Sequence, residues 1–578
     1  MARDDFHVNP HTPFAGVEPA DFHRWYPREI PPVDNTFEIG LVMAGAVSAG
    51  AYTAGVLDYL FESLDRWYRE RREDASLPRH EVKLRVMTGS SAGGINAALA
   101  AAALRYRFPH IHDDGSLQGS ANPFFDPWVN RIDIRDLLDT ADIDSGAPLT
   151  ALLNCRQLDA IAERSMGFVG DPLQPGERDW LADPFQVQLT YSNLQGVPYW
   201  IRFQGESGLP HEVVLHQDYL SFGVPVRHDA DPGQFPPDVI RLPRQRGSED
   251  RAWASLGRAA LATSAFPIAL QPREIWRSTT DYEYRFAYLG ENDRRIYARP
   301  WPAGASQPAR AVVVDGGALN NEPFDLAHRV LAGRQGKNPR RGVEAHRALL
   351  MIDPLSDARA ADPTLSDALS QVPVQLLKAF MNQSRFKQID LTLAEADDVY
   401  SRFLVAPSRH PFVGRKALAS GELGAFLGFF HRRFRQHDFL LGRYNCHFFL
   451  KNWFVLPGDN PLFRERPPAE RFQSRRRPDH YQIVPVLADD PPLPAWPTDA
   501  LDGYDDLAGP LERRLDALYP ALREQFFDRL KLGGFQRWAG RSYLWPLWRV
   551  VLRPQLRDAL EKALDGAARE IRNRRFGG

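Results

Sequence analysis

The sequence has few cysteines and no excess of either charge. Two cysteines among 578 residues, Cys155 and Cys446, cannot build a disulfide framework or a cysteine-rich zinc site, and a reducing compartment is the simplest interpretation. Lys and Arg total 71 against 73 for Asp and Glu, a net charge of −2. Dedicated nucleic-acid-binding proteins usually carry a strong basic excess, so we expect no nucleic-acid partner.

Long apolar runs are also absent. The longest, residues 95–104, is far shorter than the ~20 residues that a membrane-spanning helix needs, and the first residues lack the apolar core of a secretory signal peptide. Hydrophobic residues make up 43% and charged residues 25% of the chain, as in ordinary soluble globular proteins. We therefore expect a cytoplasmic protein, soluble or peripheral on a membrane surface.

Two successive units with the pattern of strand, turn and helix stand near the start of the chain. Residues 37–45 are a short apolar run that ends at glycine, and apolar residues then recur every three or four positions through 56–64. Residues 82–89 and 95–106 repeat this pattern around a glycine-rich turn. Successive units of this kind predict an α/β fold with a mostly parallel sheet between helices.

Later segments continue the predicted sheet and then leave it. We expect a helix in 254–270 that is broken at Pro267, and a polar, proline-rich insertion at about 206–250. Further strands are expected at 184–194, 197–205, 309–317 and 346–354. The last of these strands should end the sheet, by residue 355.

The composition changes along the chain suggest how it is divided. At about 150 residues per domain, a chain of this length holds two to four domains. Proline-rich stretches mark the connecting segments, and helical patterns dominate after the sheet. The expected parts are an N-terminal arm at 1–36, an α/β domain at 37–355, a helical extension at 356–455, a proline-rich connector at 456–509 and a helical C-terminal region at 510–578.

The sharpest chemical motif is Gly89-Ser90-Ser91-Ala92-Gly93, which fits the pattern G-x-S-x-G. An apolar strand precedes it and an alanine-rich helix follows, which is the context of a nucleophile elbow. Glycines on both sides allow a sharp turn that exposes the serine hydroxyl, and the helix N-terminus favours a developing negative charge there. Ser91 is therefore a candidate nucleophile; the alternative is a tight strand-to-helix turn without chemistry.

A serine nucleophile needs a base, and no histidine ends a buried strand in this sequence. Asp315 does, directly after three valines and before Gly316 and Gly317. A carboxylate in that position is costly unless it is paired or hydrogen-bonded, and partial burial would raise its pKa toward the useful range. We take Asp315 as the candidate general base; the alternative is an aspartate that only caps the turn.

A loop of small residues follows the first predicted strand. Its sequence is Gly45-Ala46-Val47-Ser48-Ala49-Gly50. Such a loop can point backbone N–H groups at an oxyanion. It superficially suggests a dinucleotide-binding loop, but the pattern G-x-G-x-x-G is missing, which argues against a nucleotide cofactor.

These three motifs, in this order, resemble those of the patatin-like phospholipases, which are serine lipid acyl hydrolases with a Ser–Asp dyad. The loop Gly45–Gly50 matches the oxyanion loop of the family, Gly89–Gly93 its nucleophile elbow and Asp315–Gly317 its base motif. Thr263–Pro267 resembles the small-residue segment of the family that ends in proline. The resemblance covers about 37–355.

The resemblance implies a three-layer fold, an acyl-lipid substrate such as a phospholipid, an acyl-serine intermediate on Ser91, and neither cofactor nor metal. Proton transfer would go to Asp315, and transfer of the acyl group to an alcohol would use the same residues as hydrolysis. The loop departs from the family, because Ala49 stands where an Arg or Lys is common and Val47 where a glycine is common. Since valine tolerates a positive φ poorly, we expect the oxyanion donors to come from 48–51. A catalytically inactive lipid-binding or scaffolding protein is the alternative.

Three weaker signals remain. His110 and His112 have metal-ligand spacing but lie in a polar stretch without a second ligand cluster, which favours a solvated loop. Residues 432–445 are basic and aromatic; they could contact a lipid headgroup, but a solvated helix face whose aromatic side chains enter the core is the preferred interpretation. Residues 537–553 mix Trp, Leu and Arg. That composition suits peripheral membrane contact, although packing of an accessory helical region against the core is the preferred interpretation.

Overall fold

The computed structural model describes most of the chain from residue 33 onward. The described residues are 33–112, 121–143, 148–201, 211–228, 235–245, 250–282, 308–333, 338–356, 399–464, 468–501, 505–530 and 553–576, with the single positions 372, 375, 376 and 379. Residues 1–32 of the N-terminal arm, most of the helical segment expected between 356 and 398, and all but the last residue of 537–553 lie outside this set.

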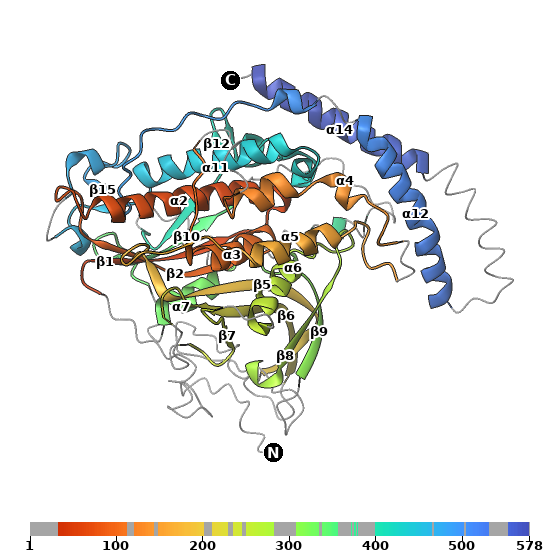
Figure 1. Ribbon diagram of the computed structural model, residues 1–578, viewed down its shortest axis with the longest axis horizontal. Coiled ribbons are helices and arrows are strands. Elements are labelled where there is room, and N and C mark those ends of the chain that lie inside the picture. Colours follow the sequence, from red (N-terminus) through yellow and green to blue (C-terminus); the bar gives the residue numbers. More distant parts are fainter. Residues whose placement is uncertain are drawn as a thin grey trace, which may run out of the picture.

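A nine-stranded sheet forms the centre of the described chain (Figure 1). Five neighbouring strands run parallel: β11 (Arg402–Val405), β10 (Arg347–Ile352), β1 (Thr36–Met43), β2 (Glu81–Gly89) and β5 (Leu181–Ile201). Beyond β5 come the antiparallel β6 (His211–Val224), then β7 (Val239–Arg241). A branch adds β9 (Pro308–Asp315), antiparallel to β5, and β8 (Arg273–Ser278). The carboxyl ends of β1, β2 and β9 carry the three motifs singled out in the sequence.

Helices cover both faces of the parallel strands. One apolar core joins alternate side chains of β1, from Phe37 to Met43, to α2 (Gly50–Glu70), α3 (Ala92–Ala103) and α11 (Arg432–Asn452). On the opposite face, Val42 and Ala44 pack against α7 (Phe324–Ala332). Every residue of β1 is buried, as expected for a strand covered on both sides. The expected α/β fold with a mostly parallel sheet between helices is confirmed.

The helices α2 and α11 lie side by side on the outer part of the first face (Figure 1). Glycines allow this close approach: a Cβ at Gly55 would overlap the carbonyl of Phe439, and a Cβ at Gly442 would overlap the carbonyl of Tyr52. Phe434 and Phe439 of α11 are fully buried. The basic segment 432–445 is thus largely a packed helix. A solvated helix face was expected here, but Arg435 is buried.

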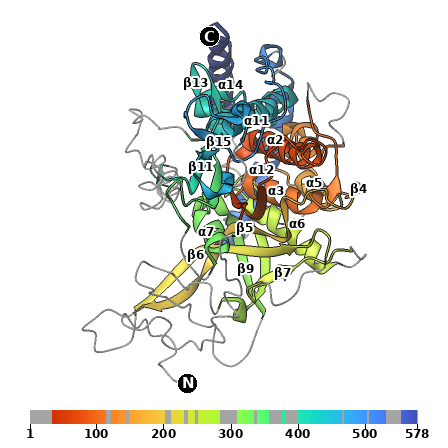
Figure 2. The same ribbon diagram turned by 90° about the vertical axis from the view of Figure 1, so that its left-hand side faces the viewer.

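Three expectations about the sheet are wrong. The strands expected at 184–194 and 197–205 are one strand, β5, whose pairing with β6 shifts register between Ser192 and Val197 around Gly196 at φ 74°. The segment expected to be a polar insertion contains β6, in which partly buried and exposed residues alternate over 213–217, as they can in an antiparallel strand. Figure 2 shows β5 and β6 projecting together from the sheet. The sheet also continues past residue 355, since β11 pairs with β10.

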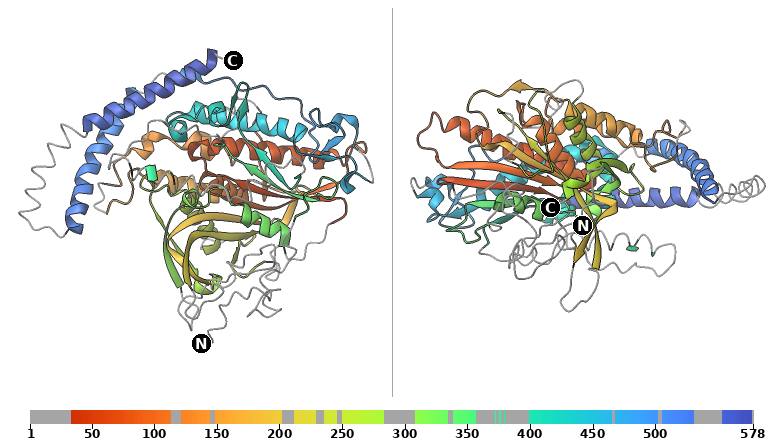
Figure 3. Two further views of the ribbon diagram at one scale, coloured as in Figure 1. Left: turned by 180° about the vertical axis from the view of Figure 1, so that it is seen from behind. Right: turned by 90° about the horizontal axis from the view of Figure 1, so that it is seen from below.

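Two long helices complete the described chain, α12 (Asp505–Arg529) and α14 (Arg553–Phe576). They lie at the periphery, and α14 runs along the outside of the layer formed by α2 and α11 (Figures 1 and 3). Smaller elements fill the region between α3 and β5, chiefly a π-helical turn at Asp126–Arg131, α4 (Ile134–Leu137) and α5 (Arg156–Met166). The helix α6 (Arg251–Thr263) precedes β8.

Within the described residues, no helix combines the length and the apolar character that crossing a bilayer requires.

Candidate active site

Ser91 occupies the turn between β2 and α3 in a conformation that side chains rarely adopt. Its φ is 51° and its ψ −124°. This backbone is strained for a residue other than glycine, and such strain clusters at functional sites. The flanking glycines have no room for a side chain, because a Cβ at Gly89 would overlap the carbonyl of Gly93, and one at Gly93 would overlap the carbonyl of Met43. The turn thereby places the Ser91 hydroxyl at the N-terminus of α3.

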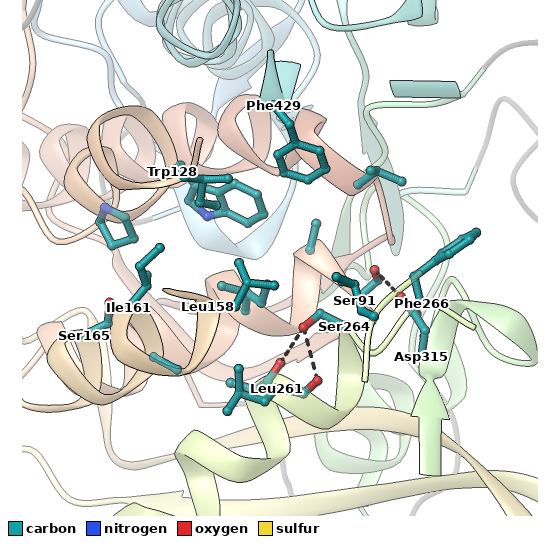
Figure 4. A pocket seen from close by; sticks show the side chains of 18 of the residues that line it. Ser91, Trp128, Leu158, Ile161, Ser165, Leu261, Ser264, Phe266, Asp315 and Phe429 are labelled. Atoms are coloured by element: carbon teal, nitrogen blue, oxygen red, sulfur yellow. Dashed lines mark hydrogen bonds between the residues drawn. The ribbon is translucent and has the colours of Figure 1, made fainter. Parts of the chain in front are cut away.

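Asp315, the last residue of β9, meets this hydroxyl although 224 positions separate the two residues. Ser91 Oγ donates to Asp315 Oδ2 at 2.6 Å, and the Gly317 amide donates to Asp315 Oδ1 at 2.7 Å (Figure 4). Asp315 therefore also caps the short 3-10 turn Gly316–Ala318. Its exposed fraction is 3%. Burial raises the pKa of Asp315 to about 7, and the hydrogen bonds from Ser91 and Gly317 only partly oppose this.

The segment Thr263–Pro267 links these two residues. The Ser91 amide donates to Thr263 Oγ1 at 2.9 Å, and the Asp315 amide donates to the carbonyl of Ala265 at 2.9 Å. A Cβ at Gly94 would in turn lie 2.5 Å from the Thr263 methyl carbon. The sequence pointed to this segment by resemblance alone; its position as a brace between the serine turn and the aspartate strand follows from the structure.

The loop Gly45–Gly50 begins beside the serine. A Cβ at Gly45 would lie 2.9 Å from the Cβ of Ser91 and 2.5 Å from Asn321 Oδ1, so the backbone approaches Ser91 as closely as it can. The side chain of Val47 reaches the pocket described below. Ser48 donates its hydroxyl to the carbonyl of Ala425.

The expectation that Val47 would avoid a positive φ is wrong, since its φ is 51°. Packing compensates for the strain: Ala46 and Ser48 on either side are buried, and the carbonyl of Ala46 accepts from the amide of Ala49 at 2.9 Å. The amide of Gly50 is bonded to the carbonyls of Val47 and Ser48. Two amides of the expected donor range 48–51 are thus already used inside the turn.

An apolar pocket opens next to Ser91 and Asp315 (Figure 4). It holds about 960 Å³ of empty space, counting the solvent at its mouth. Apart from Ser91 and Asp315, its polar lining groups are the hydroxyls of Ser165 and Ser264 and the indole N–H of Trp128. Ser264 donates to the carbonyls of Ala260 and Leu261, and the indole donates to Asn96. The pocket therefore offers a ligand an almost wholly apolar wall.

This wall follows α3 away from the serine. Ser91, Ile95 and Leu99 line it one turn apart, a length of about 12 Å along the helix axis. Leu158 and Ile161 of α5 line it as well (Figure 4). A site with one reactive end and a long apolar wall suits a fatty-acyl chain.

Several residues that shape the pocket were not singled out in the sequence. Asn96 donates to the carbonyls of Gly50 and Ala92 and accepts from Trp128, which ties the loop Gly45–Gly50 to α3. Phe426 and Phe429 also line the pocket, although they lie far from Ser91 in the sequence. Nothing local in the sequence distinguishes these phenylalanines from ordinary core residues.

Two of the weaker sequence signals, at His110 and in the segment 432–445, contribute to buried contacts, whereas His112 is exposed. His110 is not in a solvated loop: it contacts Asp58 at 2.8 Å and Asp65 at 3.9 Å. Burial alone would lower the pKa of His110, but these two carboxylates outweigh it and raise the pKa to about 9. Arg443 of the basic segment 432–445 also pairs with Asp58.

No group of three or more His, Cys, Asp and Glu side chains in the described chain is arranged to hold a metal ion. Cys155 and Cys446 are buried free thiols.

Comparison with known proteins agrees with this architecture. Residues 41–328 match the patatin-like phospholipase family. A protein of Sinorhizobium fredii, the uncharacterized protein y4iI, is 32% identical over 589 residues, which cover 91% of this chain and 82% of the relative. The family match contains both Ser91 and Asp315. The chain belongs to the patatin-like phospholipase family.

Proposed function

We propose that the protein is a lipid acyl hydrolase of the phospholipase A or lysophospholipase type, with Ser91 as nucleophile and Asp315 as general base. The observation that carries the proposal is the hydrogen bond of 2.6 Å from Ser91 Oγ to a buried carboxylate whose pKa is about 7. A base with a pKa near the working pH is well suited to take a proton in the transition state. The apolar pocket beside the pair supports an acyl ester as substrate.

The proposed reaction has two halves. Asp315 takes the proton of Ser91 as Oγ attacks the ester carbonyl, the tetrahedral intermediate expels the alcohol of the lipid, and the proton passes to that alcohol. Water, deprotonated by Asp315, then attacks the acyl-serine, and the fatty acid leaves as Ser91 regains its proton. An alcohol in place of water would give acyl transfer through the same residues.

The oxyanion of both intermediates needs N–H donors near Ser91. The loop Gly45–Gly50 supports this role, because Gly45 lies against the Ser91 Cβ and the amides at the start of the turn that follows have no acceptor within it. The amides of Ala46, Val47 and Ser48 are the proposed donors. The side chain at Ala49 is not needed for this arrangement, since a backbone amide can donate from any residue.

Purified wild-type protein and Ser91→Ala, incubated with mixed phospholipid vesicles and followed by mass spectrometry, test the proposal. Wild type should release fatty acid and lysolipid, and Ser91→Ala should release neither. A fluorophosphonate probe, which labels only an activated serine, should label wild type alone. Turnover retained by folded Ser91→Ala would refute the assignment, and a wild type that neither turns over nor labels would favour an inactive lipid-binding protein.

We further propose that residues 537–553 bring the enzyme to its substrate at a membrane surface. The segment contains Trp538, Trp545 and Trp548 together with arginines, and such residues favour the interface between headgroups and acyl chains. Replacing the three tryptophans by alanine should reduce co-sedimentation with anionic vesicles while leaving hydrolysis of a water-soluble ester unchanged. Equal co-sedimentation of the variant and wild type would remove this proposal.

A further inference from the structure

Each of the two C-terminal helices places one buried arginine against a segment that leads to the pocket wall. Arg514 of α12 has an exposed fraction of 1%. It donates to the carbonyls of Leu152 at 2.9 Å and Asp139 at 2.6 Å, and both of its terminal nitrogens bond the carboxylate of Asp142. Leu153, directly after one of these carbonyls, lines the pocket. The arginine therefore fixes the backbone from which this part of the wall projects.

Arg574 of α14 makes a set of contacts similar to that of Arg514, with two carbonyls and one carboxylate. Its exposed fraction is 3%. It donates to the carbonyls of Lys416 at 3.1 Å and Leu418 at 3.4 Å and pairs with the carboxylate of Glu422. A charged donor buried with carbonyls and a carboxylate holds its partners more firmly than a neutral one. Glu422 is the first residue of the turn that leads to Phe426 and Phe429 of the wall.

That turn, α10 (Glu422–Ala425), is strained. Leu423, Gly424 and Ala425 have φ values of 54°, 66° and 68°. Left-handed backbone is unfavourable for residues other than glycine, and it persists only where the surroundings hold it. The next residues include Phe426 and Phe429, whose rings line the pocket.

The strained turn also touches the loop that holds the proposed oxyanion donors. The carbonyl of Ala425 accepts the hydroxyl of Ser48, and a Cβ at Gly428 would lie 2.9 Å from the Ser48 Cβ. Contacts thus run without a gap from Arg574 through Glu422 and Ala425 to Ser48.

Apolar contacts also connect α12 and α14 to these parts of the site. Leu507 and Leu511 of α12 pack with Leu137 and Leu158, two residues of the pocket wall. On α14, Ile571 packs in one cluster with Leu427 and Phe434 and with the strained residue Leu423. Both helices lie beyond residue 328, where the family match ends.

We infer that the C-terminal helices complete the active site of this protein, and that Arg514 and Arg574 are positioning residues: Arg514 for the acyl-chain wall, Arg574 for the wall and the oxyanion loop together. The inference rests on the proposed function of Ser91. It assigns a catalytic purpose to a region that the family match does not cover.

The test compares Arg514→Gln and Arg574→Gln with matched controls on the same helices, Arg523→Gln and Arg569→Gln. Arg523 pairs with its neighbour Glu524, and among the described residues Arg569 donates within α14, to the carbonyl of Asp565. Full-length proteins are assayed with p-nitrophenyl butyrate and laurate and with a small fluorophosphonate probe, and folding is checked by circular dichroism.

Arg514→Gln should raise KM for laurate about tenfold while kcat for butyrate stays within twofold, because only the distant wall moves. Arg574→Gln should lower kcat for both esters about tenfold or more and slow labelling of Ser91 in proportion, since misplacement by an ångström can cost a hundredfold. Arg574→Lys should recover part of the loss. If Arg574→Gln does not fold, the double variant with Glu422→Gln takes its place, because it also removes the charge of the less exposed carboxylate partner; Glu570, the other carboxylate near Arg574, is half exposed to solvent.

Three results overturn the inference. Folded arginine variants that keep kcat and KM of both esters within twofold of wild type would show that the contacts serve folding only. Equal losses in the two control variants would show that any change on these helices acts in the same way. Wild-type protein that neither labels nor hydrolyses either ester would refute the proposed function and this inference together, whereas normal labelling with unaffected variants would refute the inference alone.

Discussion

Replacing Asp315 by asparagine should make the protein more stable at neutral pH while abolishing ester hydrolysis. The amide has the shape of the carboxylate and retains both contacts: its oxygen accepts from the Gly317 amide, and its nitrogen donates to Ser91 Oγ, which reverses that hydrogen bond. The substitution removes the negative charge that Asp315 carries when it is ionised in its buried position. The expected gain is therefore a function of pH rather than a constant.

The magnitude follows from the raised pKa of the buried carboxyl group. Burial raises the pKa of Asp315 from 3.8 to about 7. Between these values the unfolded chain releases the proton and the folded protein keeps it, so wild-type stability falls as pH rises from 3.8 and stops falling above 7. A pKa difference of one is worth about 1.36 kcal/mol, so this rise costs wild type about 4 kcal/mol. Asparagine has no such dependence. The variant should thus match wild type near pH 4 and exceed it by about 4 kcal/mol at pH 8.

Urea unfolding of both proteins at half-unit steps from pH 4.5 to 8.5, followed by tryptophan fluorescence and by circular dichroism, gives the difference in the free energy of unfolding directly. All other titrating groups are common to both proteins and cancel in the difference. Ser91→Ala is the control, because it keeps the buried carboxylate. It also loses the hydrogen bond that lowers the pKa of Asp315, so its stability should fall with rising pH at least as far as that of wild type. If the difference in the free energy of unfolding between Asp315→Asn and wild type stays the same from pH 5 to pH 8, the reasoning is refuted.

The strain and the close contacts of the site lead to further predictions. With kcat/KM for a soluble ester, activity should rise with pH through about 7 and then level off, because the buried base must be ionised; a rate independent of pH between 5.5 and 8.5 would speak against a carboxylate base. Ser91→Gly should be more stable than Ser91→Ala by about 1 kcal/mol in urea unfolding, since glycine relieves the positive φ; equal stabilities would mean that the turn is not strained. Gly55→Ala should destabilise the protein by about 1–3 kcal/mol, because its methyl group overlaps the carbonyl of Phe439 across two packed helices; Gly566→Ala, with open space around it, is the control that should show no loss.

Much of the local structure could be predicted from the sequence. The apolar runs and their spacing predicted β1, α2, β2 and α3, because buried strands and helices impose their own periods on the chain. The place of Ser91 between a strand and a helix followed from the same patterns and from the flanking glycines. Where the pattern was weak, prediction was wrong: β6 has partly exposed residues over 213–217 and resembles a polar insertion, and β11 is only four residues long.

The meeting of Ser91 with Asp315 depends on strands that come together from distant parts of the chain, and no local pattern contains that distance. The same holds for the pKa of Asp315, which burial sets, and for the positive φ of Val47, which valine would not adopt in a free peptide and which tertiary packing imposes. Phe426 and Phe429 reach the pocket, and Arg514 and Arg574 reach the segments behind its wall, for the same reason. Local sequence selects elements through backbone preference and apolar period, whereas burial, charge pairing and strain arise only when those elements pack together.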